Sequence, residues 1–95
     1  MTIVTSVPTA AWSSDYGPFT RTVWLQVRKG WIVLNCDATA PSDINDGVRL
    51  YAADQVGPIE INVVDGSTIT NMEFRVSDPG NSGAEFWYSE FPASV

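Results

Sequence analysis

The residue types that could perform catalysis are scarce in this chain of 95 residues. It has no histidine and a single lysine, Lys29, which lies in a predicted tight turn, so a serine nucleophile would lack a positioned base. Its 11 acidic residues are expected in loops or on the wet side of strands. Glycoside hydrolysis needs two differently tuned carboxyl groups in a cleft, and so small a domain has little room for one. The sequence therefore predicts no catalytic residues and a protein that is not an enzyme.

A metal site is not favoured either. The segment Asp43-Ile44-Asn45-Asp46-Gly47 is faintly similar to a calcium loop, but its spacing departs from the EF-hand pattern and the distal glutamate is missing. We interpret it as a turn in which Asp and Asn side chains bond the backbone. The alternative is an irregular cation site built from backbone carbonyls. Cys36, the only cysteine, is predicted to be a small buried hydrophobe rather than a nucleophile. No metal or other cofactor is expected.

Aromatic residues are the candidates for binding, because four tryptophans in 95 residues is a high number. Trp24 alternates with apolar neighbours that face the other way, and Trp87 stands between Phe86 and Tyr88. Three interpretations stay open: an ordinary core with covering segments, a protein interface, and a platform on which sugars stack. For an interface the sequence favours Trp12, Tyr16, Phe19, Trp24 and Trp87. For sugar stacking it favours Trp24, Trp31 or Trp87.

The elements that must position these residues are strands, because apolar and polar side chains alternate with a period of two. The predicted strands are 19–27, 31–36, 48–52, 59–64, 67–76 and 84–91, with a further short one at 2–7. Arg28-Lys29-Gly30 is expected to join the first two as a hairpin. Asp65-Gly66, the dipeptide most typical of a two-residue turn, is expected to join 59–64 to 67–76.

The fold class follows from this rhythm. No window has the apolar stripe of a helix, and turn residues return every 8–12 residues, which is typical of a sandwich or barrel. We predict an all-β domain, a small antiparallel β-sandwich or barrel of six to seven strands. Residues 1–18 are predicted to be an irregular extended N-terminal arm, and residues 19–95 the β-sandwich domain.

Composition excludes several partners. Five basic residues against 11 acidic ones give a net charge of −6, and the basic residues form no stripe, so nucleic acid and anionic membranes are not expected partners. No segment is long and apolar enough to span a bilayer, and the N-terminus does not resemble a signal peptide. Without an internal disulfide or a metal, the support left for so small a core is oligomerisation or docking on a larger body.

Three segments resemble small β-sandwich virion proteins of tailed phages. These are Val23-Trp24-Leu25-Gln26, then Ala40-Pro41-Ser42, then Asp46-Gly47-Val48-Arg49-Leu50, and the stretch that contains them covers about a third of the chain. The aromatic strand near the C-terminus and the long loop at 77–83 depart from the pattern.

The resemblance implies a non-enzymatic virion structural protein, most simply a capsid decoration (cement) subunit that stabilises a phage head. Head-fibre and tail accessory proteins belong to the same group. It implies the major capsid protein or another virion protein as partner, a homo-oligomer, typically a trimer, and a location in the virion after synthesis in the host cytoplasm. The alternative function is a carbohydrate-binding or receptor-binding β-sandwich module.

Overall fold

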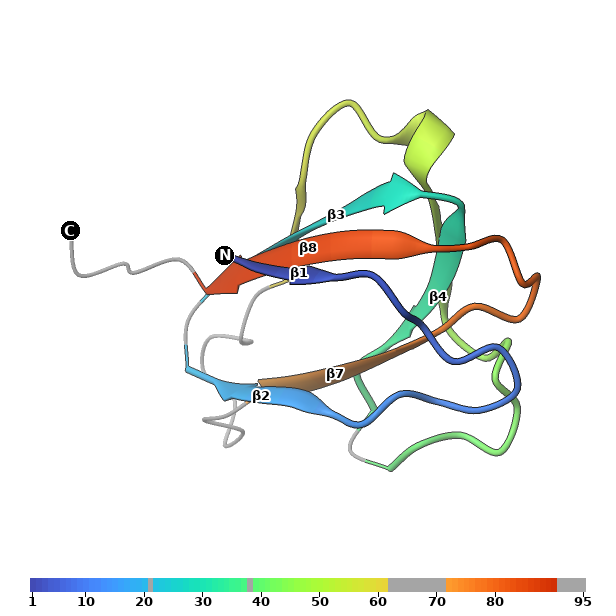
Figure 1. The fold of residues 1–95 in the computed structure, drawn as a ribbon. Coiled ribbons are helices and arrows are strands. Elements are labelled where there is room, and N and C mark those ends of the chain that lie inside the picture. The colour runs from blue at the N-terminus through green and yellow to red at the C-terminus, as the bar shows by residue number, and fades with distance from the viewer. Residues whose placement is uncertain (21, 38, 62–71, 91–95) are drawn as a thin grey trace, which may run out of the picture.

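The computed structural model describes residues 1–20, 22–37, 39–61 and 72–90, and these form a two-layered β-sandwich (Figure 1). Each layer is a four-stranded antiparallel sheet, and the shortest dimension, 19 Å, suits two sheets about 10 Å apart with their side chains. The first sheet has the order β1 (Thr2–Val4), β8 (Glu85–Glu90), β3 (Val23–Lys29), β6 (Ile59–Ile61). The second has the order β2 (Tyr16–Phe19), β7 (Met72–Ser77), β4 (Trp31–Asn35), β5 (Val48–Tyr51).

The all-β sandwich predicted from the sequence is confirmed, with eight strands in the described residues instead of six to seven. The expected count is low because one expected strand, 19–27, is not continuous. The segment 19–27 is divided between β2, which ends at Phe19 in the second sheet, and β3, which begins at Val23 in the first. A short 3-10 helix, η1 (Ala52–Asp54), follows β5. Among the described residues no helix has the length and hydropathy needed to cross a membrane.

The turn at Arg28-Lys29-Gly30 connects the two sheets, and the hairpin expected there is wrong. β3 pairs with β8 and β6, whereas β4 pairs with β5 and β7. Gly30 has φ of 63°, in the left-handed region that favours glycine, where the chain leaves one layer for the other. Each of the two strands has an apolar face in the core. Two such faces are buried equally well when the strands lie in opposite sheets as when they pair side by side in one sheet.

The second expected hairpin is also absent between the strands that the structure describes. β6 lies in the first sheet and β7 in the second, so they do not pair. The turn residues Asp65-Gly66 themselves, and the segment 62–71 around them, lie outside the described residues.

The core lies between the sheets and contains the inward side chains that alternation predicts. From the first sheet they are Val23, Leu25, Val27 and Phe86, and from the second Phe19, Ile32, Leu34, Phe74 and Val76. Tyr88 is half-buried and its ring makes an edge contact with Phe74, with centroids 5.5 Å apart. Burial of this apolar area is the main stabilising term for the fold.

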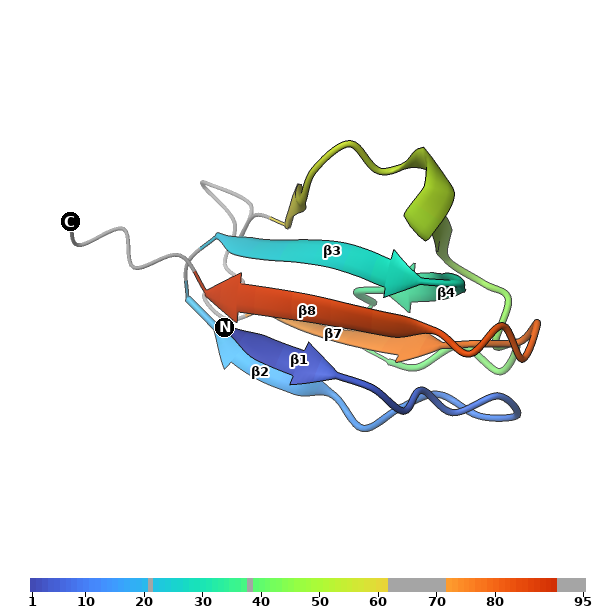
Figure 2. The same cartoon turned by 45° about the horizontal axis from the view of Figure 1, so that its top comes forward.

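Residues 1–18 are part of the sandwich, where an extended arm was expected. β1 pairs with β8 in the first sheet, and β2 pairs with β7 in the second. Between them Val7 is buried, and the backbone N–H of Asp78 donates to the carbonyl of Pro8 at 2.8 Å. Figure 2 shows β1 and β2 along the same side of the molecule, joined by this loop. The segment looked irregular in sequence because it changes sheets within a few residues.

Candidate binding surfaces

The outer face of the first sheet has a cluster of large apolar side chains. Ile3 of β1 lies directly opposite Trp87 of β8, and Trp24 of β3 lies opposite Ser89, two residues further along β8. Trp24 and Trp87 are therefore diagonal neighbours, a spacing that aromatic side chains can bridge. Met1 adjoins the same row and is 78 % exposed, while Ile3 is 48 % exposed. We call Met1, Ile3, Trp24 and Trp87 the outer aromatic patch.

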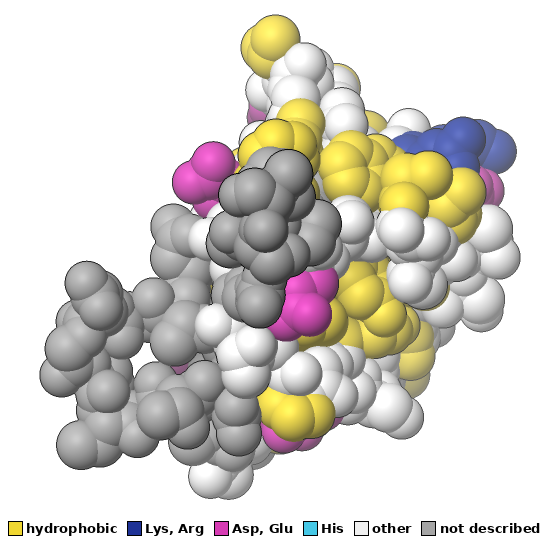
Figure 3. Space-filling model, turned by 90° about the vertical axis from the view of Figure 1, so that its left-hand side faces the viewer, with side chains coloured by type: hydrophobic (Ala, Val, Ile, Leu, Met, Phe, Trp, Pro, Cys, Tyr) yellow, Lys and Arg dark blue, Asp and Glu magenta, His cyan; other side chains and the backbone are white. Residues whose placement is uncertain are grey.

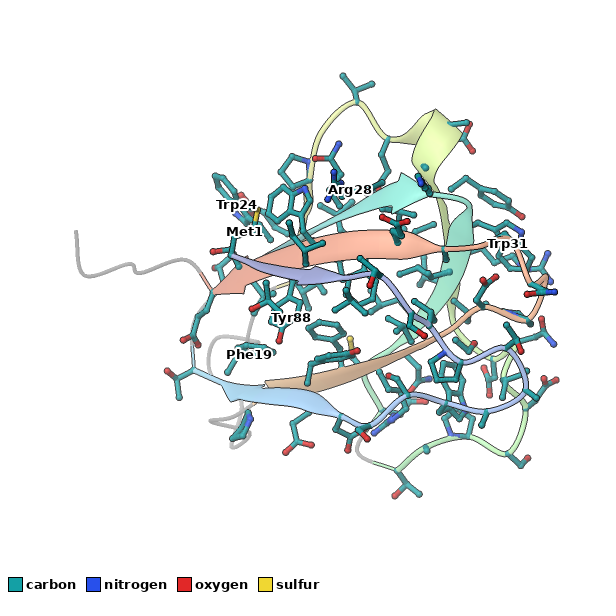
Figure 4. The ribbon with its side chains drawn as sticks, in the orientation of Figure 1. Met1, Phe19, Trp24, Arg28, Trp31 and Tyr88 are labelled. Carbon is teal, nitrogen blue, oxygen red and sulfur yellow. The ribbon has the colours of Figure 1, made fainter. Side chains whose placement is uncertain are left out.

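The alternation of each strand explains why this patch faces solvent. Val23 and Leu25 of β3 are fully buried in the core, so Trp24 between them must point to the opposite side. Figure 4 shows Trp24 and Met1 together on the outside of the first sheet, with Phe19 and Tyr88 pointing between the sheets. In the space-filling view, hydrophobic side chains gather in the upper part of the molecule, with Lys and Arg at one margin (Figure 3).

Polar side chains surround the patch. Gln26 lies opposite Trp87, and Glu60 of β6 lies opposite Trp24. At the far end of the sheet, Lys29 and Glu85 form an ion pair at 3.3 Å. An apolar centre with a polar border is the usual composition of a protein interface.

The outer face of the second sheet, in contrast, is covered by the protein's own loops. Arg75 of β7 points outward, yet it is only 2 % exposed. Its Nη1 donates to Oδ1 of Asn35 at 2.5 Å and to the carbonyl of Asp37 at 2.8 Å, and its Nε donates to Oδ1 of Asp15 at 3.0 Å. One buried guanidinium thus joins β7, β4 and two loops.

Further hydrogen bonds hold the covering loops in place. The indole N–H of Trp12 donates to the carbonyl of Pro41 at 2.9 Å, which joins loop 5–15 to loop 36–47. Ser13 bonds Val76 of β7 through both its backbone N–H and its hydroxyl. The hydroxyl of Ser77 donates to the carbonyl of Ile44 at 2.7 Å. Under these loops the face offers little surface to a partner, because its polar groups are already satisfied internally.

Asp78 organises the loop that follows β7. It is 2 % exposed, and its carboxylate accepts bonds from the N–H and hydroxyl of Ser82 and from the N–H of Ala84, at 2.8–3.1 Å. Desolvation by burial raises the pKa of this carboxyl, but the bonds from Ser82, Ala84 and Gly83 together lower it more, so the net pKa lies below the ordinary value. The loop at 77–83 is therefore held by a buried carboxylate.

The outer face of the second sheet also has an accessible part on β4 and β5, where Arg49 and Tyr51 are exposed and Trp31 is half-buried. Trp31 is directly opposite Tyr51, and their rings stack with centroids 5.5 Å apart. The guanidinium carbon of Arg49 lies 5.2 Å from the centre of the Trp31 ring. We call these three residues the Trp31 ladder. Sequence reasoning did not select Arg49 or Tyr51, although their spacing of two on a predicted strand places them on one face.

The five residues predicted for an interface are distributed over three environments. Trp24 and Trp87 lie together on the open face. Trp12 is half-buried beneath loop 36–47, as its bond to Pro41 requires. Phe19 is 8 % exposed and Tyr16 is half-buried, and both rings stack on Phe74. Trp24 and Trp87 are also half-buried, but of the five only these two lie together on the outer face of a sheet.

The residues considered for chemistry have structural surroundings. Oδ1 of Asp43 accepts the N–H of Asn45 at 2.8 Å, which confirms the predicted turn. In the part of the chain that the structure describes, no three metal-ligating side chains come together. Cys36 is exposed, so the expectation that it is buried is wrong: β4 ends one residue earlier. Partial desolvation by neighbouring atoms still raises the pKa of its thiol.

Comparison with known proteins does not indicate what these surfaces bind. No protein-family model matches the chain, and neither a curated protein nor a solved structure shows significant similarity to it.

Proposed function

We propose that the chain is a non-enzymatic structural subunit of a phage virion, most simply a decoration subunit that docks on the head through the outer aromatic patch. The observation that supports this proposal is the asymmetry between the two outer faces. Trp24 and Trp87 are diagonal neighbours on paired strands of one face, while the protein's own loops cover the other face over β7. The partner is then the major capsid protein or another virion protein, and the location is the virion.

The patch has the properties of a docking site for protein. Tryptophans near the centre of an interface contribute disproportionately to binding energy. Here they lie on paired strands, so little conformational entropy is lost when a partner covers them. Net charge of −6 and scattered basic residues give no comparable support to nucleic acid as the partner.

Co-sedimentation with heads tests the proposal. The purified chain is mixed with expanded heads of the phage that encodes it, and the pelleted fraction is measured. We expect the wild type to pellet with the heads, and the double variant Trp24→Ala/Trp87→Ala to bind at least tenfold more weakly. Val56→Ser is the matched control, because Val56 is a fully exposed apolar residue away from the patch. A wild type that stays in the supernatant, or a double variant that binds as well as Val56→Ser, contradicts the proposal.

Carbohydrate or receptor binding is the second candidate, and one observation favours it. Gln26 and Glu60 stand beside the two tryptophans of the patch, so ring stacking and hydrogen bonds to sugar hydroxyls are both on offer. Trp31 is a poorer platform, since Tyr51 and Arg49 already contact its ring. Titration of tryptophan fluorescence with a panel of glycans tests this, with Trp24→Phe and Trp87→Phe as controls. If no glycan changes the emission, this candidate is excluded.

A further inference from the structure

The four sheet edges of the molecule differ in how well they could pair with another strand. β1 has three residues, and β6 directly follows Pro58. β2 contains Pro18 and its register against β7 is irregular. Short strands, prolines and irregularities are the usual devices that protect an edge. β5 has neither a proline nor an irregular register, and among the described residues no strand pairs with its far side.

The hydrogen bonds around Trp31 show which backbone groups β5 presents. The N–H of Trp31 donates to Oγ of Ser82 at 3.0 Å, and the carbonyl oxygen of Trp31 lies 3.2 Å from the same Oγ, which donates its one hydrogen to the nearer Asp78 carboxylate. These groups therefore point away from β5, and the pair Trp31–Tyr51 is not hydrogen-bonded. The N–H of Ala52 bonds the carbonyl of Gly30 at 2.9 Å, as this alternation requires. It follows that Arg49 and Tyr51 direct their N–H and C=O groups to the open edge.

The exposed side chains at this edge include a cation and an aromatic ring, which attract each other. Val48 is 61 % exposed and Tyr51 is 37 % exposed, and Arg49 is exposed on the same face as Tyr51. In the Trp31 ladder a cation already lies over an aromatic ring. A second copy of the strand would extend that ladder if it placed a cation next to Tyr51.

We propose that β5 pairs antiparallel with β5 of a second copy, with Leu50 opposite Leu50. The two copies are related by a two-fold axis perpendicular to the sheet, so the outer face of one copy continues as the outer face of the other. Odd-numbered residues of one β5 can therefore lie opposite only odd-numbered residues of the other, and even-numbered residues opposite only even-numbered ones. This register places Arg49 opposite the second copy's Tyr51, and the same pair forms again by symmetry. Each pair exchanges two main-chain hydrogen bonds. The register with Arg49 opposite Arg49 would bring like charges together, which is destabilising.

The product is a dimer in which the second sheets of two copies form one continuous sheet. A two-fold pairing is closed, so the edge is used up and no further copies add to it. The phage resemblance implies a trimer, and this edge favours a dimer instead. The outer aromatic patch lies on the first sheet and stays available. The proposal needs only the isolated chain and does not rest on the proposed virion function.

Sedimentation velocity of the purified chain tests the pairing. We expect the mass to rise with concentration from 10.4 kDa to twice that value. The concentration series extends to about 1 mM, because a small interface gives weak association. Tyr51→Arg places arginine opposite Arg49 and should weaken the dimer at least tenfold. The exchange Arg49→Tyr/Tyr51→Arg restores an Arg–Tyr pair and should recover it. Val56→Arg makes the same charge change at a fully exposed position outside β5, in the loop between η1 and β6, and should dimerise like the wild type.

Amide hydrogen exchange of the wild type gives a measurement that no unfolded variant can obscure. The amides of Arg49 and Tyr51 should become more protected as concentration rises, whereas the exposed amide of Val56 should not. A chain that stays monomeric throughout, a trimeric mass, or equal dimerisation of Tyr51→Arg and Val56→Arg overturns the proposal. Failure to bind phage heads would leave this result unchanged.

Discussion

The two outer faces of the sandwich differ although their strands have the same alternating pattern. On the first sheet the outward residues include Ile3, which is 48 % exposed, and Trp24 and Trp87, which are half-buried. On the second sheet the outward residues under the loops, Val33, Arg75 and Ser77, are 0–2 % exposed, and the exposed outward residues lie on β5. The difference comes from the loops: 5–15 and 36–47 both bond the second sheet or each other.

This contrast separates stability from binding. Outward residues under the loops are part of a second, polar layer, so changing them should alter the free energy of unfolding. Outward residues of the open face have no such layer above them, so changing them should alter association with a partner. Substitutions at Arg75, at Val33 and Ile3 as a pair, at Asp78 and at Asp15 test how these regions are held, from the largest expected effect to the smallest.

Replacing Arg75 should have the largest effect. Arg75→Met keeps much of the side chain's volume but removes the donors that join Asn35, Asp15 and the carbonyl of Asp37. Loss of one partner from a buried polar network costs about 3 kcal/mol or more. The midpoint of urea unfolding, followed by tryptophan fluorescence, measures it. A variant within about 0.5 kcal/mol of the wild type would show that the loops are held by other contacts.

A matched pair of apolar residues gives the next effect. Val33 and Ile3 both point outward from strands, but Val33 is 0 % exposed and Ile3 is 48 % exposed. Val33→Ser leaves a small cavity and a buried hydroxyl and should cost about 2–3 kcal/mol. Ile3→Ser should cost less than about 1 kcal/mol. Equal losses in urea unfolding would remove the distinction between a covered and an open face.

The sequence was sufficient to predict these strands but not their partners. Alternation in Val23, Leu25 and Val27 identifies a strand with one buried face, whichever sheet it joins. It cannot tell whether the next strand pairs beside it or packs across from it, since both arrangements bury the same residues. The turn at Gly30 has the composition of a hairpin, and only the pairing of β3 with the distant β8 shows that it crosses between sheets.

The candidate site was predicted in part for the same reason. Trp24 and Trp87 could be assigned to the wet side of their strands from their neighbours alone. That they are diagonal neighbours depends on the β3–β8 register, which no local pattern specifies. Tyr16 and Phe19 resembled exposed arm residues because nothing local indicated that β2 joins the second sheet and places them against Phe74.

Asp78 should make stability depend on pH. Its folded pKa is lowered, so its contribution is complete above the ordinary carboxyl pKa, about 4, and is lost as pH falls towards the folded value. Asp78→Asn should cost about 1–2 kcal/mol at pH 7, because the remaining acceptor oxygen is uncharged and the NH2 group cannot accept the bonds made by the second carboxylate oxygen. Between pH 5 and about 3 the wild type should lose more stability than the variant. If thermal unfolding shows that the wild type and Asp78→Asn lose the same stability between these pH values, the charged carboxylate does not stabilise this loop.

Asp15 should give the smallest effect, although it bonds the same arginine that dominates the covered face. The bond from Arg75 lowers the pKa of Asp15, yet the Asp15 side chain is 44 % exposed, so water and salt screen the pair. Asp15→Asn keeps an acceptor for Nε of Arg75 and should cost less than about 1 kcal/mol, with the difference shrinking further at high salt. The buried bonds of Arg75 to Asn35 and Asp37 are unaffected. Urea unfolding at low and high salt measures the change, and a loss as large as that of Arg75→Met would mean that the surface end of the network, rather than its buried end, holds the loops on the second sheet.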